Sequence, residues 1–210
     1  MRSVEDKYVE WERLVREITN CRKCAISYSR KNPVPGEGSL NAEIMFIGEA
    51  PGGREDELGR PFVGAAGNLL TKLLNEIGLE RSDVFIGNVL KCRPPGNRDP
   101  TEEEIDNCLP FLIRQIKLIQ PRVIVTLGRF SAMVISRLAG IRFRGITRER
   151  GIVRKITLFG SEVVFLPTYH PAAALYKPPL LDSLRNDFST LKRIISGEVE
   201  DKTTLDSFFR

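Results

Sequence analysis

Long hydrophobic runs are absent from this sequence. Its first residues, MRSVEDKYVEWERLVREITN, carry charges throughout and lack the apolar stretch of a secretory signal peptide. No later apolar run reaches the length of a transmembrane helix. We therefore expect a cytoplasmic protein that has no membrane partner.

The usual nucleotide-binding signatures are also missing. The glycine-rich segment GEAPGG, residues 48–53, lacks the Lys-Ser pair of a P-loop and the G-x-G-x-x-G spacing of a dinucleotide-binding fold. A phosphate cradle is therefore a poor interpretation of this segment. A glycine-rich turn still lets a flat ligand come close to backbone amides.

Cysteine is scarce, with four residues in the chain. In a reducing compartment these cysteines are poor candidates for two structural disulfides. Cys21 and Cys24 form a C-x2-C pair, whereas Cys92 and Cys108 lie far downstream. The pattern favours one four-thiolate metal site over scattered core thiols, and both zinc and an iron–sulfur cluster accept four thiolates. The spacing alone does not choose between them.

Histidine occurs once, as His170 in the segment TYHP, residues 168–171. Composition alone favours a role in the core, because a lone histidine after an apolar run usually has a backbone partner. The position of this residue relative to the expected strands argues for a different role.

Size and charge limit the class of protein. The 210 residues suit one domain, which we expect to span residues 1–197 and to be followed by a loose tail over residues 198–210. The 32 Lys and Arg residues against 27 Asp and Glu residues give a net charge of +5. The resulting pI of about 9.1 suggests a nucleic-acid partner without establishing one.

Apolar periodicity predicts alternating helices and strands. Helices are expected over residues 4–20, 67–77, 102–119, 130–138 and 180–195. Strands are expected over residues 44–47, 83–90 and 123–128, and a hairpin over residues 152–166 leads into a last strand that ends at TYHP. Thr101 and Glu104 are spaced to form a capping box at the start of one helix.

This alternation is typical of an α/β protein. We expect three layers, with a central, mostly parallel, four-stranded sheet flanked by helices. Ligands bind beyond the carboxyl ends of the strands in such sheets, so the turns after the strands should meet along one edge. These turns are GEAPGG, GNVLKC, GRF and TYHP. His170 then lies where binding sites are built.

Four segments together are specific enough to resemble a known family. They are GEAPGGREDELGRPFVGAAGNLL (48–70), NVLKCRPPGNRDPTEEEIDNC (88–108), VTLGRFSA (125–132) and TYHPAAAL (168–175). In order and spacing they resemble the family 4 uracil-DNA glycosylases, over about residues 10–195. The resemblance implies the uracil-DNA glycosylase-like α/β fold and a DNA repair enzyme. Such an enzyme flips uracil out of DNA and hydrolyses its N-glycosidic bond, leaving an abasic site.

The resemblance also implies a 4Fe-4S cluster bound by Cys21, Cys24, Cys92 and Cys108. It further implies a uracil-binding set made up of Glu49, Ala50, Pro51, Glu55, Phe62, Asn88 and His170, in which His170 and Glu49 are the catalytic residues.

Each residue in this set has an implied task. Asn88 would accept from uracil N3–H and donate to O4, and Phe62 would stack on the base. Glu55 and Pro51 would help to exclude the thymine methyl group. His170 would donate from a neutral ring to uracil O2, where negative charge grows as the base leaves.

The resemblance says less about which residue activates the water that attacks the sugar. Ala50 stands where family 1 glycosylases have an aspartate, so Glu49 is the candidate that would assist the water. The alternative is that Glu49 only orients the turn.

The segment AAALYKPP (172–179) would be a loop that enters the duplex to hold the gap. Leu175, Tyr176 and Lys177 are candidates for DNA contact: Tyr176 could act as a wedge and Lys177 could bind phosphate, with an ordinary surface turn as the alternative. Further candidates for phosphate contact are Lys91, Arg93, Arg98 and Arg129.

The tail KTTLDSFFR places Leu205, Phe208 and Phe209 on one face of a helical turn. It resembles the clamp-binding peptide of replication and repair proteins, with Lys202 where that motif usually has glutamine. We expect a monomer whose tail binds a trimeric sliding clamp; docking of the tail on its own domain is the alternative.

Two rival functions remain open at this stage. One is a non-catalytic, cluster-bearing DNA-binding module that senses redox state or damage. The other is a family 5 glycosylase with a broader range of bases, against which the acidic GREDE segment argues. The sequence does not determine strand preference, action on other deaminated bases or the role of the cluster.

Overall fold

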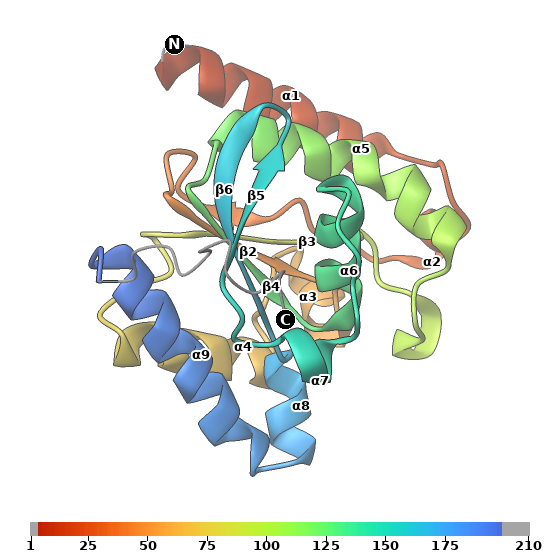
Figure 1. Cartoon of the computed structure of the whole chain (residues 1–210). Helices are drawn as coiled ribbons and strands as arrows, with labels where there is room; N and C mark the ends of the chain where they lie inside the picture. Colours follow the sequence, from red (N-terminus) through yellow and green to blue (C-terminus); the bar gives the residue numbers. More distant parts are fainter. Residues whose placement is uncertain (1–3, 199–210) are drawn as a thin grey trace.

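The computed structural model describes residues 4–198, and its elements alternate between helix and strand along most of the chain (Figure 1). The strands are β1 (Glu37–Gly38), β2 (Ile44–Gly48), β3 (Phe85–Asn88), β4 (Val123–Leu127), β5 (Arg154–Leu158) and β6 (Ser161–Thr168). The helices are α1 (Val4–Asn20), α2 (Ile26–Ser29), α3 (Gly53–Leu58), α4 (Ala65–Glu76), α5 (Glu102–Ile119), α6 (Arg129–Leu138), α7 (Ile146–Glu149), α8 (Pro171–Tyr176) and α9 (Leu180–Ile195), with a 3-10 turn η1 (Pro95–Asn97).

One mixed sheet forms the centre, with the strand order β1-β3-β2-β4-β6-β5. The strands β3, β2, β4 and β6 are mutually parallel, and β1 and β5 pair antiparallel at the two edges. The expected α/β class and mostly parallel sheet are confirmed, but the sheet has six strands rather than four. The two-residue β1 is too short to give a periodic signal, and β5 is the first half of the expected hairpin.

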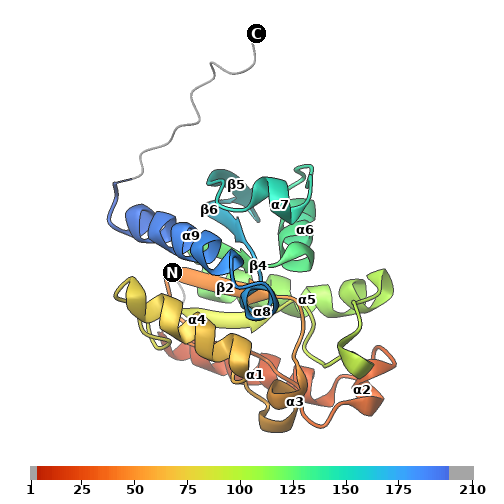
Figure 2. The ribbon, with the colours of Figure 1, turned by 90° about the horizontal axis from the view of Figure 1, so that it is seen from below.

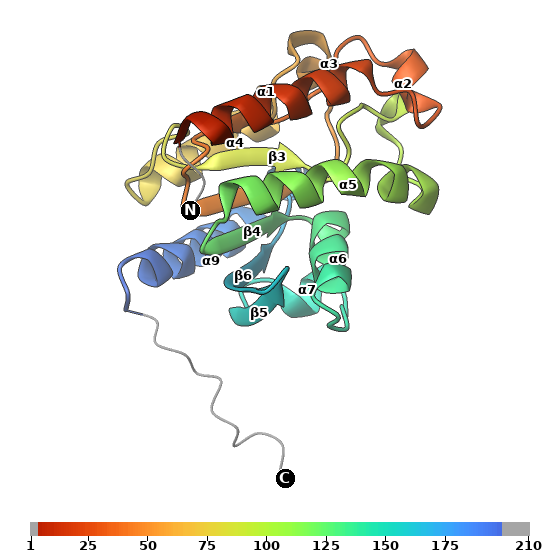
Figure 3. The same cartoon turned by 90° about the horizontal axis from the view of Figure 1, so that it is seen from above.

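Helices cover both faces of the sheet, as the three-layer prediction requires. Side chains from α1, α5 and α6 form one apolar cluster with the sheet, including Leu14, Leu112 and Ala132. Side chains from α4 and α9 form the other, including Leu73 and Phe188. Figure 3 shows α1 and α5 running side by side over one face, and Figure 2 shows α4 and α9 over the other.

The helix predictions are confirmed, including the capping box at α5. The Thr101 hydroxyl accepts from the Glu104 N–H at 3.2 Å, and the Glu104 carboxylate accepts from the Thr101 N–H at 2.9 Å. The prediction that 172–179 is a loop was wrong in its first half, because α8 begins at Pro171 and ends at Tyr176. Proline suits the first turn of a helix, where its missing N–H has no role.

The carboxyl ends of the parallel strands lie along one edge, as predicted. Backbone hydrogen bonds join the turns that follow them: the Val89 N–H donates to the Gly48 carbonyl and the Gly128 N–H donates to the Thr168 carbonyl, both at 2.9 Å. Gly128 has a φ of 98°, and a Cβ atom there would lie 3.2 Å from His170 Cβ. The turn after β4 therefore lies directly against His170.

Across residues 4–198, no helix is both long enough and apolar enough to cross a membrane.

Candidate active site and four-cysteine site

A pocket of about 330 Å³ opens at the carboxyl edge of the sheet. This volume is within the usual range for a small-molecule site. Its walls come from the end of β3, from the turns after β2, β3 and β6, from α3, α4 and the loop between them, from η1 and from α8. They contain Glu49, Ala50, Pro51, Gly52, Glu55, Phe62, Ala66, Asn88, Pro94, Asn97, Arg98, His170, Ala172 and Tyr176. The structure thus brings together all seven residues of the expected uracil-binding set.

The rings of Phe62 and His170 are stacked in this pocket. Their centroids are 5.5 Å apart and their planes differ by 26°. Phe62 is buried and has a φ of 51°, a conformation that is costly for an aromatic residue. The surrounding structure must therefore hold it in place.

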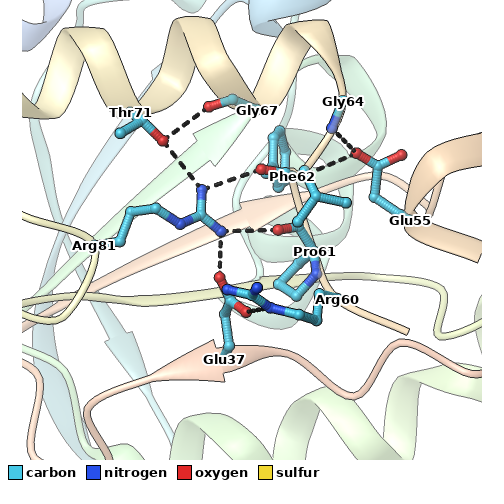
Figure 4. A network of polar contacts seen from close by, with 10 residues as sticks. Glu37, Glu55, Arg60, Pro61, Phe62, Gly64, Gly67, Thr71 and Arg81 are labelled. Atoms are coloured by element: carbon cyan, nitrogen blue, oxygen red, sulfur yellow. Dashed lines mark hydrogen bonds and ion pairs between the residues drawn. The ribbon is translucent and has the colours of Figure 1, made fainter. Parts of the chain in front are cut away.

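A network of polar contacts supplies this hold (Figure 4). The Arg81 guanidinium donates to the carbonyls of Pro61 and Phe62, at 2.8 and 3.1 Å, and is itself paired with Glu37. On the other side, Glu55 Oε1 accepts from the N–H groups of Val63 and Gly64, both at 2.9 Å. The sequence reasoning missed Arg81, because its role depends on contacts far along the chain.

Asn88 ends β3 and points into the pocket with an unsatisfied acceptor. The residue is 1% exposed, and its Oδ1 atom has no hydrogen-bond partner among the described residues. A Cβ atom at Gly48 would lie 2.3 Å from this oxygen and 2.7 Å from Phe62 Cζ. Glycine at position 48 is therefore needed for both side chains to reach the pocket.

His170 is a neutral ring with a defined proton. Burial lowers its pKa to about 4, against a smaller opposite effect of the Glu55 charge. The Nδ1 atom accepts from the Ala172 N–H at 3.2 Å, as the N-cap of α8. Since Nδ1 is an acceptor, the ring proton is on Nε2, which has no hydrogen-bond partner within residues 4–198 and can donate to a ligand.

The carboxyl group of Glu49 has a pKa close to neutral pH. Burial and the negative charge of Asp99 raise its pKa to about 7, and the positive charge of Arg129 opposes this shift. Asp99 and Arg129 are themselves an exposed ion pair. A carboxyl group with this pKa can exchange a proton with water at physiological pH.

The expected DNA-contact residues fall into two groups. Leu175 and Tyr176, at the end of α8, are 48% and 86% exposed, and Lys177 follows them on the surface. Arg93 donates to Asn97 at 2.8 Å, and Arg129 is paired with Asp99. Tyr176 lines the pocket, Leu175, Lys177 and Arg129 are exposed, and Arg93 is partly exposed.

The other two candidates for phosphate contact have different surroundings. Arg98 is exposed at the pocket wall, so its contact with phosphate stays a prediction. Arg98 pairs with Glu104 through two hydrogen bonds, at 2.5 and 2.8 Å. Lys91 was expected to contact phosphate, and this prediction was wrong: the residue is 1% exposed and lies inside the protein. Its Nζ donates to the Asn88 carbonyl and to Gln115 Oε1, both at 2.6 Å. Burial lowers its pKa to about 8.

The four cysteines line one narrow cavity between the end of α1 and the middle of α5. They are free thiols, and Cys92 and Cys108 are buried. Burial raises the pKa of Cys24, Cys92 and Cys108, that of Cys108 to about 12, and the charge of neighbouring thiolates raises each of them further. Four thiolates therefore need added positive charge to coexist here.

Donors are already directed at two of the sulfur atoms. Arg30 donates to Cys92 Sγ at 2.9 Å, and the Lys91 N–H donates to Cys108 Sγ at 3.2 Å. Within residues 4–198, no three His, Cys, Asp or Glu side chains converge closely enough to hold a single metal ion. The four cysteines nevertheless line one cavity, and four thiolates are a ligand set that either a zinc ion or an iron–sulfur cluster accepts.

The chain matches known proteins over most of its length. The family model described as the uracil DNA glycosylase superfamily matches residues 35–192. The chain is similar to the Type-4 uracil-DNA glycosylase of Saccharolobus solfataricus, with 51% identity over 91% of this chain and 88% of the relative. It is also similar to the Type-4 uracil-DNA glycosylase of Sulfurisphaera tokodaii, with 53% identity over 87% of this chain and 84% of the relative. The Type-4 uracil-DNA glycosylase of Archaeoglobus fulgidus is 52% identical over 85% of this chain and 89% of the relative.

Proposed function

Because this chain belongs to the uracil DNA glycosylase superfamily, we propose that it is a DNA repair enzyme that excises uracil. It flips uracil out of DNA, hydrolyses the N-glycosidic bond and releases free uracil, leaving an abasic site. The observation that carries this proposal is the buried Oδ1 of Asn88, which has no partner in the described part of the chain and lies in a pocket beside the Phe62 and His170 rings. A buried acceptor without a partner is costly, and the N3–H of an everted uracil would satisfy it.

Selectivity follows from hydrogen-bond pattern and shape. The Asn88 amide accepts from uracil N3–H and donates to O4, whereas cytosine presents the opposite pattern at both atoms. Phe62 stacks on the base. Glu55, held by two backbone N–H groups, and Pro51 form a rigid wall that would clash with the additional methyl group of thymine.

Leaving-group stabilisation is the task of His170. As the bond between C1′ and N1 breaks, its electron pair stays on uracil and negative charge gathers at O2. The Nε2–H of the neutral ring donates to this oxygen, and the bond strengthens as the charge grows. A preorganised donor of this kind contributes about 3–4 kcal/mol to transition-state stabilisation.

Glu49 then acts on the water that attacks the sugar. As a carboxylate it accepts a proton from this water while the oxygen bonds to C1′. Burial keeps its pKa near 7, so that a useful fraction is ionised at physiological pH. Ala50 leaves room beside it and provides no second carboxylate.

DNA is held around the pocket by the exposed residues at its edge. Leu175 and Tyr176 fill the space that the flipped nucleotide leaves, and the nearby cations contact phosphate groups; these are Arg93, Arg129 and Lys177. The Arg129–Asp99 pair has to open for this contact, at a small cost, since both side chains are exposed.

The four cysteines hold a 4Fe-4S cluster, with Arg30 and the Lys91 N–H donating to its thiolates. The iron ions of such a cluster would supply the positive charge that keeps four buried thiols ionised. The cluster would join the end of α1 to α5 and to the turn after β3.

The remaining parts of the proposal concern the whole chain. The catalytic domain spans residues 1–197, works as a monomer in the cytoplasm, and carries the tail 198–210. Leu205, Phe208 and Phe209 lie outside the described residues, so their proposed binding to a trimeric sliding clamp rests on the sequence. Deleting residues 203–210 should abolish clamp binding and spare uracil release; clamp binding that survives the deletion contradicts the peptide assignment.

One assay tests the central function. An oligonucleotide with a single labelled uracil should release free uracil, whereas thymine opposite guanine in the same sequence should be retained. Binding without release of any base would instead support a cluster-bearing sensor module. Release of several bases at similar rates would support a broader glycosylase.

A further inference from the structure

A fully buried lysine lies between the pocket and the four cysteines. Lys91 follows β3 by three residues and precedes Cys92, so the two sites are joined by one short stretch of chain. Its side chain turns back and Nζ donates to the carbonyl of Asn88. Its own N–H donates to Cys108 Sγ on α5. Lys91 therefore contacts both the uracil-reading residue and a cysteine of the proposed cluster site.

The partners of Nζ among the described residues are neutral. They are the Asn88 carbonyl and Gln115 Oε1, at 2.6 Å each, and Gln115 is fixed in turn by donating to the Pro35 carbonyl at 2.6 Å. A buried ammonium group without an opposite charge is expensive. Lys91 also lines the narrow cavity that the four cysteines share, so a thiolate-bound cluster there would bring negative charge close to the ammonium group.

We propose that Lys91 is a positioning residue that fixes Asn88 for uracil reading and is the counter-ion of the cluster, so that the two sites are energetically coupled. The inference rests on the proposed function. The ammonium group holds the carbonyl of Asn88, and this sets the direction of the side chain at the end of β3. An anionic, thiolate-bound cluster stabilises the ammonium group in that place.

The coupling has two measurable consequences. A nearby cation stabilises the more negative, reduced form of a cluster, so removing it lowers the reduction potential. Coupling is also reciprocal: if the cluster's charge affects how Asn88 holds uracil, bound uracil must shift the potential of the cluster.

The first experiment compares Lys91→Met with the wild-type holoprotein. Methionine keeps the length of the side chain and removes its charge and donors. We expect a lower reduction potential and about tenfold weaker binding of an oligonucleotide with 2′-fluoro-2′-deoxyuridine, which resists cleavage. Gln115→Met is the matched control: it removes the other buried partner of Nζ but keeps the cation. It should lower the melting temperature and leave the potential unchanged.

The second experiment uses the wild-type holoprotein alone, so it does not depend on the folding of a variant. Its reduction potential is measured with the 2′-fluoro-uracil oligonucleotide and with the same oligonucleotide carrying cytosine at that position. Both add the same phosphate charge. A potential that differs between the two supports the coupling, and equal potentials overturn it.

Other outcomes are equally decisive. The inference is overturned if the reduction potential is unchanged in Lys91→Met. It is also overturned if Lys91→Met and Gln115→Met lose uracil binding equally, or if the purified protein contains no iron. Failure of the proposed function is seen separately, as absence of uracil release by the wild-type protein in the same preparation.

Discussion

The Nδ1 atom of His170 accepts a hydrogen bond from the backbone N–H of Ala172 at 3.2 Å, two residues along the chain. This contact and burial of the ring give a neutral imidazole whose proton is on Nε2. The start of α8 thereby determines which ring nitrogen carries the proton.

Removing this donor should slow catalysis severely. We expect His170→Ala to lower kcat by about 10²- to 10³-fold, the usual effect of losing one preorganised donor. Single-turnover release of uracil measures this change. Because the pKa of His170 is about 4, the ring stays neutral above pH 5 and should contribute no step to the pH profile between pH 5 and 9. A full rate in His170→Ala contradicts the assigned role.

Glu49 should produce the pH dependence that His170 does not. Its pKa is raised to about 7, so the carboxylate form grows as the pH rises through 7. The rate of uracil release should therefore rise with pH up to about 7.5–8 and then level off. Glu49→Gln should remove this rise and slow the reaction less than His170→Ala. A profile that is unchanged in Glu49→Gln would restrict Glu49 to orienting the turn.

Changing the amide that reads the base should change selectivity. Asn88→Asp replaces a donor by an acceptor and should loosen the preference for uracil over cytosine. Two mismatched buried groups, at about 1–3 kcal/mol each, account for a preference of about 10²- to 10⁴-fold that the variant would reduce. Competition between uracil and cytosine oligonucleotides measures it. An intact preference would mean that another group reads the base.

Adding one methyl group at Gly48 should disturb the pocket without touching the substrate. In Gly48→Ala the new Cβ would lie 2.3 Å from Asn88 Oδ1 and 2.7 Å from Phe62 Cζ, so both side chains must move. We expect at least about tenfold weaker binding of uracil DNA, from an overpacking cost of about 1–3 kcal/mol. Gly87→Ala is the control, since its Cβ would meet nothing closer than 3.5 Å.

Loss of one cysteine should release the cluster and loosen the fold around it. Cys108→Ser should lower the iron content and the broad visible absorbance, and the melting temperature should fall because α5 is no longer joined to α1. Iron analysis and thermal unfolding measure these effects. Zinc in place of iron in the wild-type protein would contradict the cluster assignment.

Much of the architecture followed from local patterns. The periodicity of apolar residues predicted the parallel strands and the helices between them. The spacing of Thr101 and Glu104 predicted a capping box, which the structure confirms. The short elements were missed because their patterns are weak. GREDEL forms α3 between glycines, and β1 has two residues. Segment 172–179 was expected to be a loop, although proline at its start suits the helix α8.

The sequence by itself determined the family, the order of the elements and the edge of the sheet where the pocket lies, because these depend on chemistry that is local in the chain. Only the tertiary structure decided which polar atoms are left without partners. Asn88 Oδ1 has no partner within residues 4–198, Phe62 is held at a φ of 51° by Arg81, and Lys91 is buried rather than exposed to phosphate. Each of these features depends on packing between segments that are distant in the chain. Packing decides which polar groups are buried, and burial without a partner raises the free energy of a polar group.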